Sequence, residues 1–139
     1  MYKIIKKVQF SEKVFRLDVE APLIAKARKA GHFVIIRVGE KGERVPLTIA
    51  GSDPEKGTIT LVVQTVGAST NKLCALNEGD YITDVVGPLG KATHIENYGT
   101  VVCAGGGVGV APMLPIIQAL KAAGNRVISV LAGRSKELI

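Results

Sequence analysis

The sequence predicts a six-stranded antiparallel β-barrel followed by the beginning of an α/β domain. Residues 2 to about 96 contain short runs rich in β-branched residues, and turn residues separate these runs. Six strands at this spacing are typical of a small barrel. From Tyr98 onward, two apolar strands enclose a glycine-rich loop and a helix, which indicates one parallel crossover unit. We therefore divide the chain into a barrel at 1–97 and the first β-α-β unit of a second domain at 98–139.

Each predicted barrel strand is a local run bounded by glycine, proline, asparagine or aspartate. The six runs are "YKIIKKVQF", "VFRLDVE", "FVIIRV", "VPLTIAG", "TITLVVQTV" and "YITDVVG". Two short helices are expected between them, at Leu23 to Lys29 and at Asn71 to Leu76. The second of these follows the Ser69-Thr70 pair.

The second part of the chain has longer apolar segments. "TVVCA" and "RVISVLAG" are strands of the kind buried on both faces of a parallel sheet. Between them, "VAPMLPIIQALKAAGN" has apolar residues at helical spacing, and Gly124-Asn125 is a good C-terminal stop. Two strands and one helix leave a sheet face and an edge unfilled. We therefore expect a truncated domain, completed by further chain, by another chain or by self-association.

Composition limits the function classes without choosing among them. The 139 residues carry a formal net charge of +6, which suits nucleic acid, an acidic protein or phosphate-bearing ligands. No apolar run is long enough for a membrane-spanning helix, and the N-terminus lacks the features of a signal peptide. Cys74 and Cys103 are too few and too far apart for a disulfide framework, so a cytoplasmic location is expected.

The glycine-rich loop lies where a phosphate group can be held. Glycine lets the backbone approach a ligand closely, and free N–H groups and the helix dipole favour an anion. The candidate residues are Gly105, Gly106, Gly107 and Gly109. The strict dinucleotide fingerprint requires glycine where Val110 stands, and an acidic residue where Arg134 stands. The strand before and the helix after favour phosphate binding over a tight turn without a ligand.

A second candidate is "ERVPLTIAG" at 43–51. Arg44 could pair with a pyrophosphate, and the lack of an N–H at Pro46 suits an edge where a ligand lies. A flavin could join a basic barrel to a dinucleotide-binding unit, and Thr48 could then hydrogen-bond the reactive edge of the flavin ring. Leu47 and Ile49 alternate into the core. An edge strand with a solvated arginine is the alternative, and this stretch alone favours that alternative.

A third candidate is "VGAST" at 66–70. Gly67 frees the backbone, and Ser69 and Thr70 offer hydroxyls and N–H groups at the start of a short helix. A plain helix N-cap explains this stretch equally well. His32, in a turn before a strand, is expected to be structural.

In their order and spacing, these stretches together with "GDYITDVVGPLG" and "VISVLAGR" resemble the ferredoxin–NADP reductase superfamily over the whole chain. Within it, the chain most resembles the small (alpha) subunits of NADH-dependent ferredoxin:NADP oxidoreductase, also described as sulfide dehydrogenase subunits. It is also similar to their relatives, the electron-transfer subunits of dihydroorotate dehydrogenase.

The resemblance implies a role for each stretch. Arg44, Pro46, Leu47 and Thr48 match the flavin motif, with the arginine on the FAD phosphates and the threonine near flavin N5. Gly67, Ser69 and Thr70 match the second FAD-phosphate stretch. Gly105 to Gly109, with Val110 and Pro112, match the pyridine-nucleotide loop, which accounts for the missing glycine. A [2Fe–2S] cluster is expected only beyond the present chain, because Cys74 and Cys103 do not match its motif and are expected to pack.

The implied activity is flavin-dependent electron transfer: hydride exchange between NAD(P)H and FAD, with onward electrons to an iron–sulfur carrier. The implied partner is ferredoxin or a larger FAD/iron–sulfur oxidoreductase subunit, with no role for nucleic acid or membrane, and the chain alone is not expected to be fully active. One alternative is a basic barrel that binds single-stranded nucleic acid without redox activity, but this requires aromatic platforms in a basic groove. The three tyrosines and three phenylalanines do not cluster with lysines along the sequence. Another alternative is a structural fragment that is too incomplete to hold a cofactor.

Overall fold

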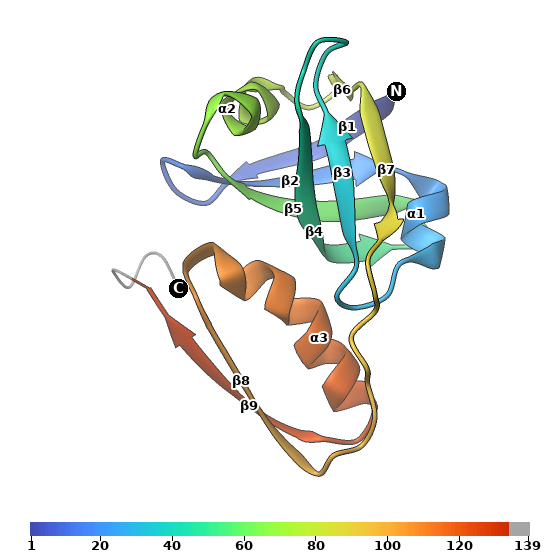
Figure 1. Ribbon diagram of the computed structural model, residues 1–139, viewed down its shortest axis with the longest axis vertical. Helices are drawn as coiled ribbons and strands as arrows, with labels where there is room; N and C mark the ends of the chain where they lie inside the picture. The colour runs from blue at the N-terminus through green and yellow to red at the C-terminus, as the bar shows by residue number, and fades with distance from the viewer. Residues whose placement is uncertain (134–139) are drawn as a thin grey trace.

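The computed structural model describes residues 1–133, which form a curved antiparallel sheet with a β-α-β unit beneath it (Figure 1). The elements of the first part are β1 (Tyr2–Gln9), β2 (Val14–Glu20), α1 (Pro22–Ala27), β3 (Phe33–Arg37), β4 (Arg44–Asp53), β5 (Thr58–Gln64), α2 (Ala68–Ala75), β6 (Tyr81–Ile82) and β7 (Asp84–Leu89). The second part contains β8 (Thr100–Gly106), a short 3-10 turn η1 (Gly107–Gly109), α3 (Val110–Ala122) and β9 (Arg126–Ala132). The boundary that we predict at residue 97 falls between β7 and β8.

The sheet is a barrel of seven strands rather than six, in the order β6-β1-β2-β5-β4-β3-β7. The predicted strand "YITDVVG" is interrupted at Thr83. Its first two residues pair with β1, and the segment that starts at Asp84 pairs with β3. Strands β1 and β3 lie towards opposite ends of the strand order. Because β6 and β7 are separated only by Thr83, they bring these two ends of the sheet together. The Thr83 hydroxyl accepts a hydrogen bond from the Gly39 N–H at 2.7 Å.

The barrel core follows from the alternation of each strand. Ile59, Leu61 and Val63 of β5 are no more than 1% exposed, and they pack with apolar residues of β1 to β4. Helices α1 and α2 add Ile24 and Leu73 to this core. Cys74 also belongs to the core, as we predict, whereas Cys103 is half-buried in β8.

Both short helices differ from their predicted bounds. Helix α1 ends before Arg28, whose backbone is extended (φ −67°, ψ 145°). Helix α2 begins three residues earlier than predicted, because the Thr70 hydroxyl accepts the N–H of Gly67 at 3.1 Å and fixes the first turn there.

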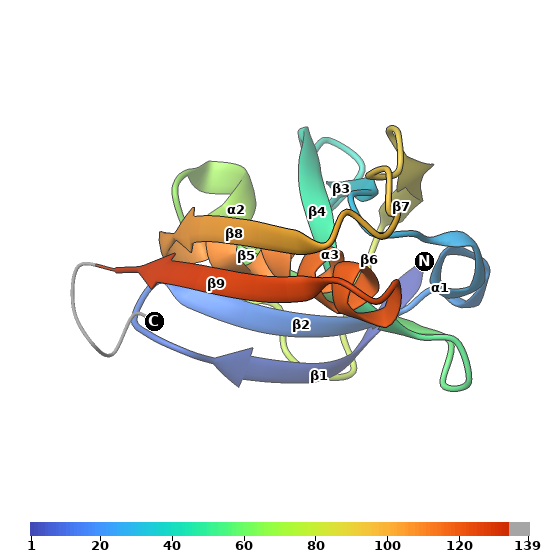
Figure 2. The ribbon, with the colours of Figure 1, turned by 90° about the horizontal axis from the view of Figure 1, so that it is seen from below.

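The β-α-β crossover has the predicted form. Strands β8 and β9 pair in parallel from Thr100 with Arg126 to Gly106 with Ala132. Helix α3 lies between this pair and the barrel, and it contacts β4 as well as β8 and β9 (Figures 1 and 2). Gly124 follows α3 with φ +97°, a backbone conformation that favours glycine at a helix end.

The described residues leave part of β8 and β9 uncovered, as the sequence predicts for an incomplete unit of two strands and one helix. Val102 is 63% exposed and Val130 is 51% exposed. Among the described elements, α3 is the one that packs on the pair, and it lies on one face. In β9 the exposure extends to both faces, since the consecutive residues Val130 and Leu131 are 51% and 42% exposed. Within residues 1–133, no helix is long and apolar enough to cross a membrane.

Candidate functional site

The first half of β4 is an edge. Residues 44–48 pair with β3, whereas pairing with β5 begins only at Ile49. Pro46 stands opposite Ile35 in the half that has one neighbour. A proline, which cannot donate a backbone hydrogen bond, is tolerated in such a position. Pro46 therefore lies at an edge of the sheet, as the sequence predicts.

Side chains alternate along this half-strand. Val45 and Leu47 pack against the barrel core and Ile49 is part of it, as the pattern predicts for Leu47 and Ile49. Arg44 and Pro46 are exposed and Thr48 is half-buried, which places these three on the opposite, outer face. No hydrogen bond joins the Thr48 hydroxyl to another residue within 1–133. Leu47 could contribute to a ligand on the outer face only through its backbone.

Arg44 shares a carboxylate with a second arginine. Arg44, Arg37 and Asp84 lie in one row across β4, β3 and β7. The Arg37 guanidinium is 2.6 Å from the Asp84 carboxylate and also donates to the Glu40 carbonyl at 2.8 Å. Arg44 is 3.7 Å from Asp84, and its side chain is 55% exposed. Arg37 is therefore tightly held, whereas Arg44 is free to turn toward an anion at little cost.

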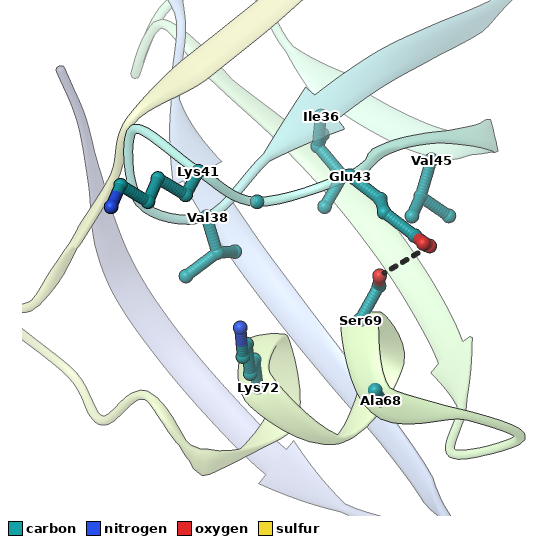
Figure 3. Close-up of a pocket in the computed structure, with 9 residues that line it drawn as sticks. Ile36, Val38, Lys41, Glu43, Val45, Ala68, Ser69 and Lys72 are labelled. Carbon is teal, nitrogen blue, oxygen red and sulfur yellow. Dashed lines mark hydrogen bonds between the residues drawn. The ribbon is translucent and has the colours of Figure 1, made fainter.

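Ser69 and Thr70, at the start of α2, have different roles. The Thr70 hydroxyl is buried and accepts the N–H groups of Val66 and Gly67 at 2.9 and 3.1 Å. It also donates to the Gly67 carbonyl, so it serves as the helix cap and has no capacity left for a ligand. Ser69 instead faces outward and donates to Glu43 Oε2 at 3.2 Å (Figure 3).

The Glu43–Ser69 contact lies in a groove of about 200 Å³ between the β3–β4 hairpin and α2. Its walls are apolar, and its polar groups are Lys41, Glu43, Ser69 and Lys72 (Figure 3). The structure thus brings the stretches 43–48 and 67–70 together through Glu43 rather than through Arg44, which does not line the groove. Sequence reasoning missed Glu43 and Lys41, because "GEKGE" has the pattern of a plain turn, and it missed Lys72 because that residue lies in the short helix rather than in a recognised motif. The position of Glu43 next to Arg44 was the available signal.

The glycines from the end of β8 to the start of α3 are required for different reasons. Gly107 has φ +58°, a left-handed conformation that favours glycine. A Cβ on Gly105 would lie 3.0 Å from Met113 Cε, so this glycine lets α3 pack on β8. A Cβ on Gly107 or Gly109 would meet nothing within 4 Å, so the turn has an open side. The loop contacts β5, the strand that leads into residues 66–70.

One lysine lies against an aromatic ring. Lys7 Nζ is 5.1 Å from the centre of the Phe15 ring. The same amino group donates to the carbonyls of Cys74 and Leu76, the latter at 2.8 Å. It therefore caps the C-terminal end of α2, which is a structural role.

His32 has a structural role as well, because its Nδ1 accepts the N–H of Lys29 at 2.9 Å. Among residues 1–133, no three His, Cys, Asp or Glu side chains are grouped so that they could hold a metal ion. Arg134 lies outside the described residues.

Known proteins are similar to this chain in sequence and in fold. A curated relative from Thermotoga maritima, described as a dihydroorotate dehydrogenase B (NAD(+)) electron transfer subunit homolog, is 49% identical over 137 residues, 99% of this chain and 49% of its own length. The solved structure of an NADH-dependent reduced ferredoxin-NADP oxidoreductase has a TM-score of 0.97 and 49% identity, and the match covers 100% of this chain and 51% of that one. Phthalate dioxygenase reductase, at 20% identity and a TM-score of 0.81 over 99% of this chain and 44% of that one, shows the same fold.

The chain spans about half the length of the curated relatives that it matches. Residues 2–94, which contain the whole barrel, match the family model described as the oxidoreductase FAD-binding domain. The chain therefore belongs to the oxidoreductase FAD-binding domain family.

Proposed function

We propose that this chain is the FAD-binding part of an electron-transfer subunit. In this proposal the subunit exchanges a hydride between NAD(P)H and FAD and passes electrons to an iron–sulfur carrier. The observation that carries it is the outer face of the β4 edge, where Arg44, Pro46 and Thr48 stand together in a barrel of the FAD-binding family. The names of the two relatives at 49% identity support the electron-transfer role.

The residues present fit FAD. Arg44 is exposed and loosely paired, so its guanidinium can turn to a diphosphate and match two of its oxygens. Beside it, Arg37 Nε is buried and has no partner among the described residues, which keeps an uncompensated donor under the same face. The first N–H groups of α2, at Ala68, Ser69 and Thr70, are available to a phosphate because a helix leaves them without intrahelical acceptors.

FAD, when bound, supplies the chemistry that converts a hydride into single electrons. The protein's own contribution is to bind and orient. Thr48 would donate its hydroxyl to the reactive edge of the ring, and its half-buried position limits the access of water to that edge. Pro46 would keep the outer face free of a competing backbone donor.

The turn at Gly105 to Gly109 would hold the phosphates of the nicotinamide nucleotide. Its support is the open side of Gly107 and Gly109 and the start of α3 immediately after them. The electron acceptor would be ferredoxin or a larger FAD/iron–sulfur subunit, and a [2Fe–2S] cluster would be held outside this chain. We also propose a cytoplasmic location.

Flavin release and single-turnover reduction test the proposal. Purified protein should be yellow and should release FAD on denaturation, as identified by chromatography. A colourless protein that takes up no added FAD would contradict the proposed function.

Thr48→Val in the full-length protein should leave FAD bound and slow its reduction by NADH or NADPH about tenfold or more, because a donor to the reacting edge is lost. Stopped-flow absorbance measures this rate. Thr60→Val, on neighbouring β5, is the matched control and should reduce at the parent rate.

A further inference from the structure

A cleft of about 750 Å³ lies between the barrel and the second half of α3. Helix α1 and the turn after it, the end of β4 and the linker before β8 form its other walls. Gln118 lines it, eight residues after the start of α3 and thus about 12 Å along the helix from the glycine turn. The cleft is therefore separate from the glycine turn and from the groove at Ser69. Its volume falls in the range of small-molecule sites.

The charge of the cleft has one sign. Lys26, Arg28 and Lys29 line it, and no carboxylate does. Three acidic residues adjoin the lining residues in the sequence. Asp53 accepts the N–H groups of residues 55 and 56, and Glu96 is 2.8 Å from the His94 ring. Glu55 is exposed and does not line the cleft. The cations of the cleft are thus not neutralised by its own walls.

Arg28 is held at the wall of the cleft. Its Nε donates to Ser52 Oγ at 2.7 Å, which ties the turn after α1 to the end of β4. The side chain is half-buried, and this burial lowers the pKa of its guanidinium. No carboxylate within residues 1–133 forms an ion pair with it. A desolvated cation without a counter-charge destabilises a fold, and an anion bound in the cleft would offset that cost.

We propose that this cleft binds a phosphate-bearing small molecule. Arg28 presents its remaining guanidinium donors to the phosphate, and Ser52 fixes the orientation of that fork. Lys26 and Lys29 add positive charge at the mouth, and Gln118 supplies an uncharged donor from α3. Because the ligand touches both the barrel and α3, its binding also holds the two parts together.

The test uses the full-length protein loaded with FAD, so that a flavin site is already filled. Inorganic diphosphate is titrated by calorimetry, and ADP is titrated in a parallel arm. Saturable binding of diphosphate is expected, with Arg28→Met weakening it at least about tenfold and Lys29→Met weakening it less. Lys3→Met removes the same charge at an exposed position of β1 and should leave the affinity unchanged. Tighter binding of ADP assigns a nucleotide, whereas equal binding assigns an inorganic phosphate.

Nuclear magnetic resonance of the parent protein gives a readout that needs no variant. Diphosphate should shift the amide signals of residues 26–30 and of Ser52. Absence of saturable binding up to about 10 mM would overturn the proposal. Shifts confined to residues 105–109, or equal affinity in Arg28→Met, Arg28→Lys and the parent, would do the same.

Discussion

The barrel and the β-α-β unit both contain apolar strands, yet β5 of the barrel and β9 of the unit bury theirs very differently. Val63 of β5 is 1% exposed, whereas Val130 of β9 is 51% exposed. Strand β5 has sheet partners on both sides and a closed core beneath it, but β9 pairs only with β8 and is covered on one face. The number of neighbours, rather than the hydrophobicity of a strand, decides its burial.

The candidate binding residues also lie in two regions that differ in how completely they are buried. Arg44, Pro46 and Thr48 stand on a framework closed around a core, while the glycine turn depends on β8, α3 and a contact with β5. FAD affinity should therefore be determined by the barrel.

The largest expected effect is on FAD binding. Arg44→Ala should weaken FAD by about 2–4 kcal/mol, because it removes a charge-assisted contact to phosphate. Gly109→Ala in the β-α-β unit should leave FAD affinity unchanged, since its Cβ would meet nothing within 4 Å. Flavin content after gel filtration and fluorescence titration measure both. Equal losses in the two variants would show that the two regions bind FAD jointly.

Matched truncations of valine compare the stability of the two regions. Val63→Ala should lower the free energy of unfolding by about 2–3 kcal/mol, through lost burial and a cavity in the barrel core. Val130→Ala should change it by less than about 0.5 kcal/mol. Urea unfolding followed by circular dichroism gives both values. A large loss for Val130→Ala would mean that β9 is covered in solution.

The reactivities of Cys74 in the barrel and Cys103 in the β-α-β unit test how deeply each region is buried. Burial raises the pKa of the Cys74 thiol, an effect that nearby Lys7 partly opposes. Since the thiolate is the reactive form, Cys74 should react with a disulfide reagent at pH 8 about tenfold or more slowly than half-buried Cys103. The Cys74 rate should rise as pH increases toward its raised pKa. Folded protein that labels Cys74 first would contradict the closed barrel core.

The smallest effect concerns the contact between the two barrel stretches. Glu43→Gln should tighten FAD by about 1 kcal/mol, because it removes a carboxylate from the N-terminal end of α2, where a phosphate is favoured. Glu78→Gln, at the end of the barrel near Lys7, is the control and should have no effect. Weaker FAD binding in Glu43→Gln would show that the carboxylate supports the cofactor instead of competing with it.

The sequence was informative where local pattern determines structure. The crossover at 100–132 and the alternation of Leu47 and Ile49 follow from periodicity within a few residues. The break at Thr83 could not be predicted in this way, because it depends on pairing with β1 and β3, which lie far away in the sequence. The same is true of the site: Glu43 meets Ser69 across 26 positions, and Lys7 reaches the end of α2 across 67.

The interruption at Thr83 also determines the order in which the barrel is completed. Tyr2, among the first residues to be synthesised, finds its strand partner only at Ile82. During translation, β1 must therefore remain without one of its neighbours until nearly all of the barrel has left the ribosome, and closing so long a loop is slow. Strands β2, β4 and β5 can pair before that. The outer face that carries Arg44 and Thr48 can thus form while the sheet is still open. The segment that contains β6 and β7 then closes the barrel by pairing with β1 and β3.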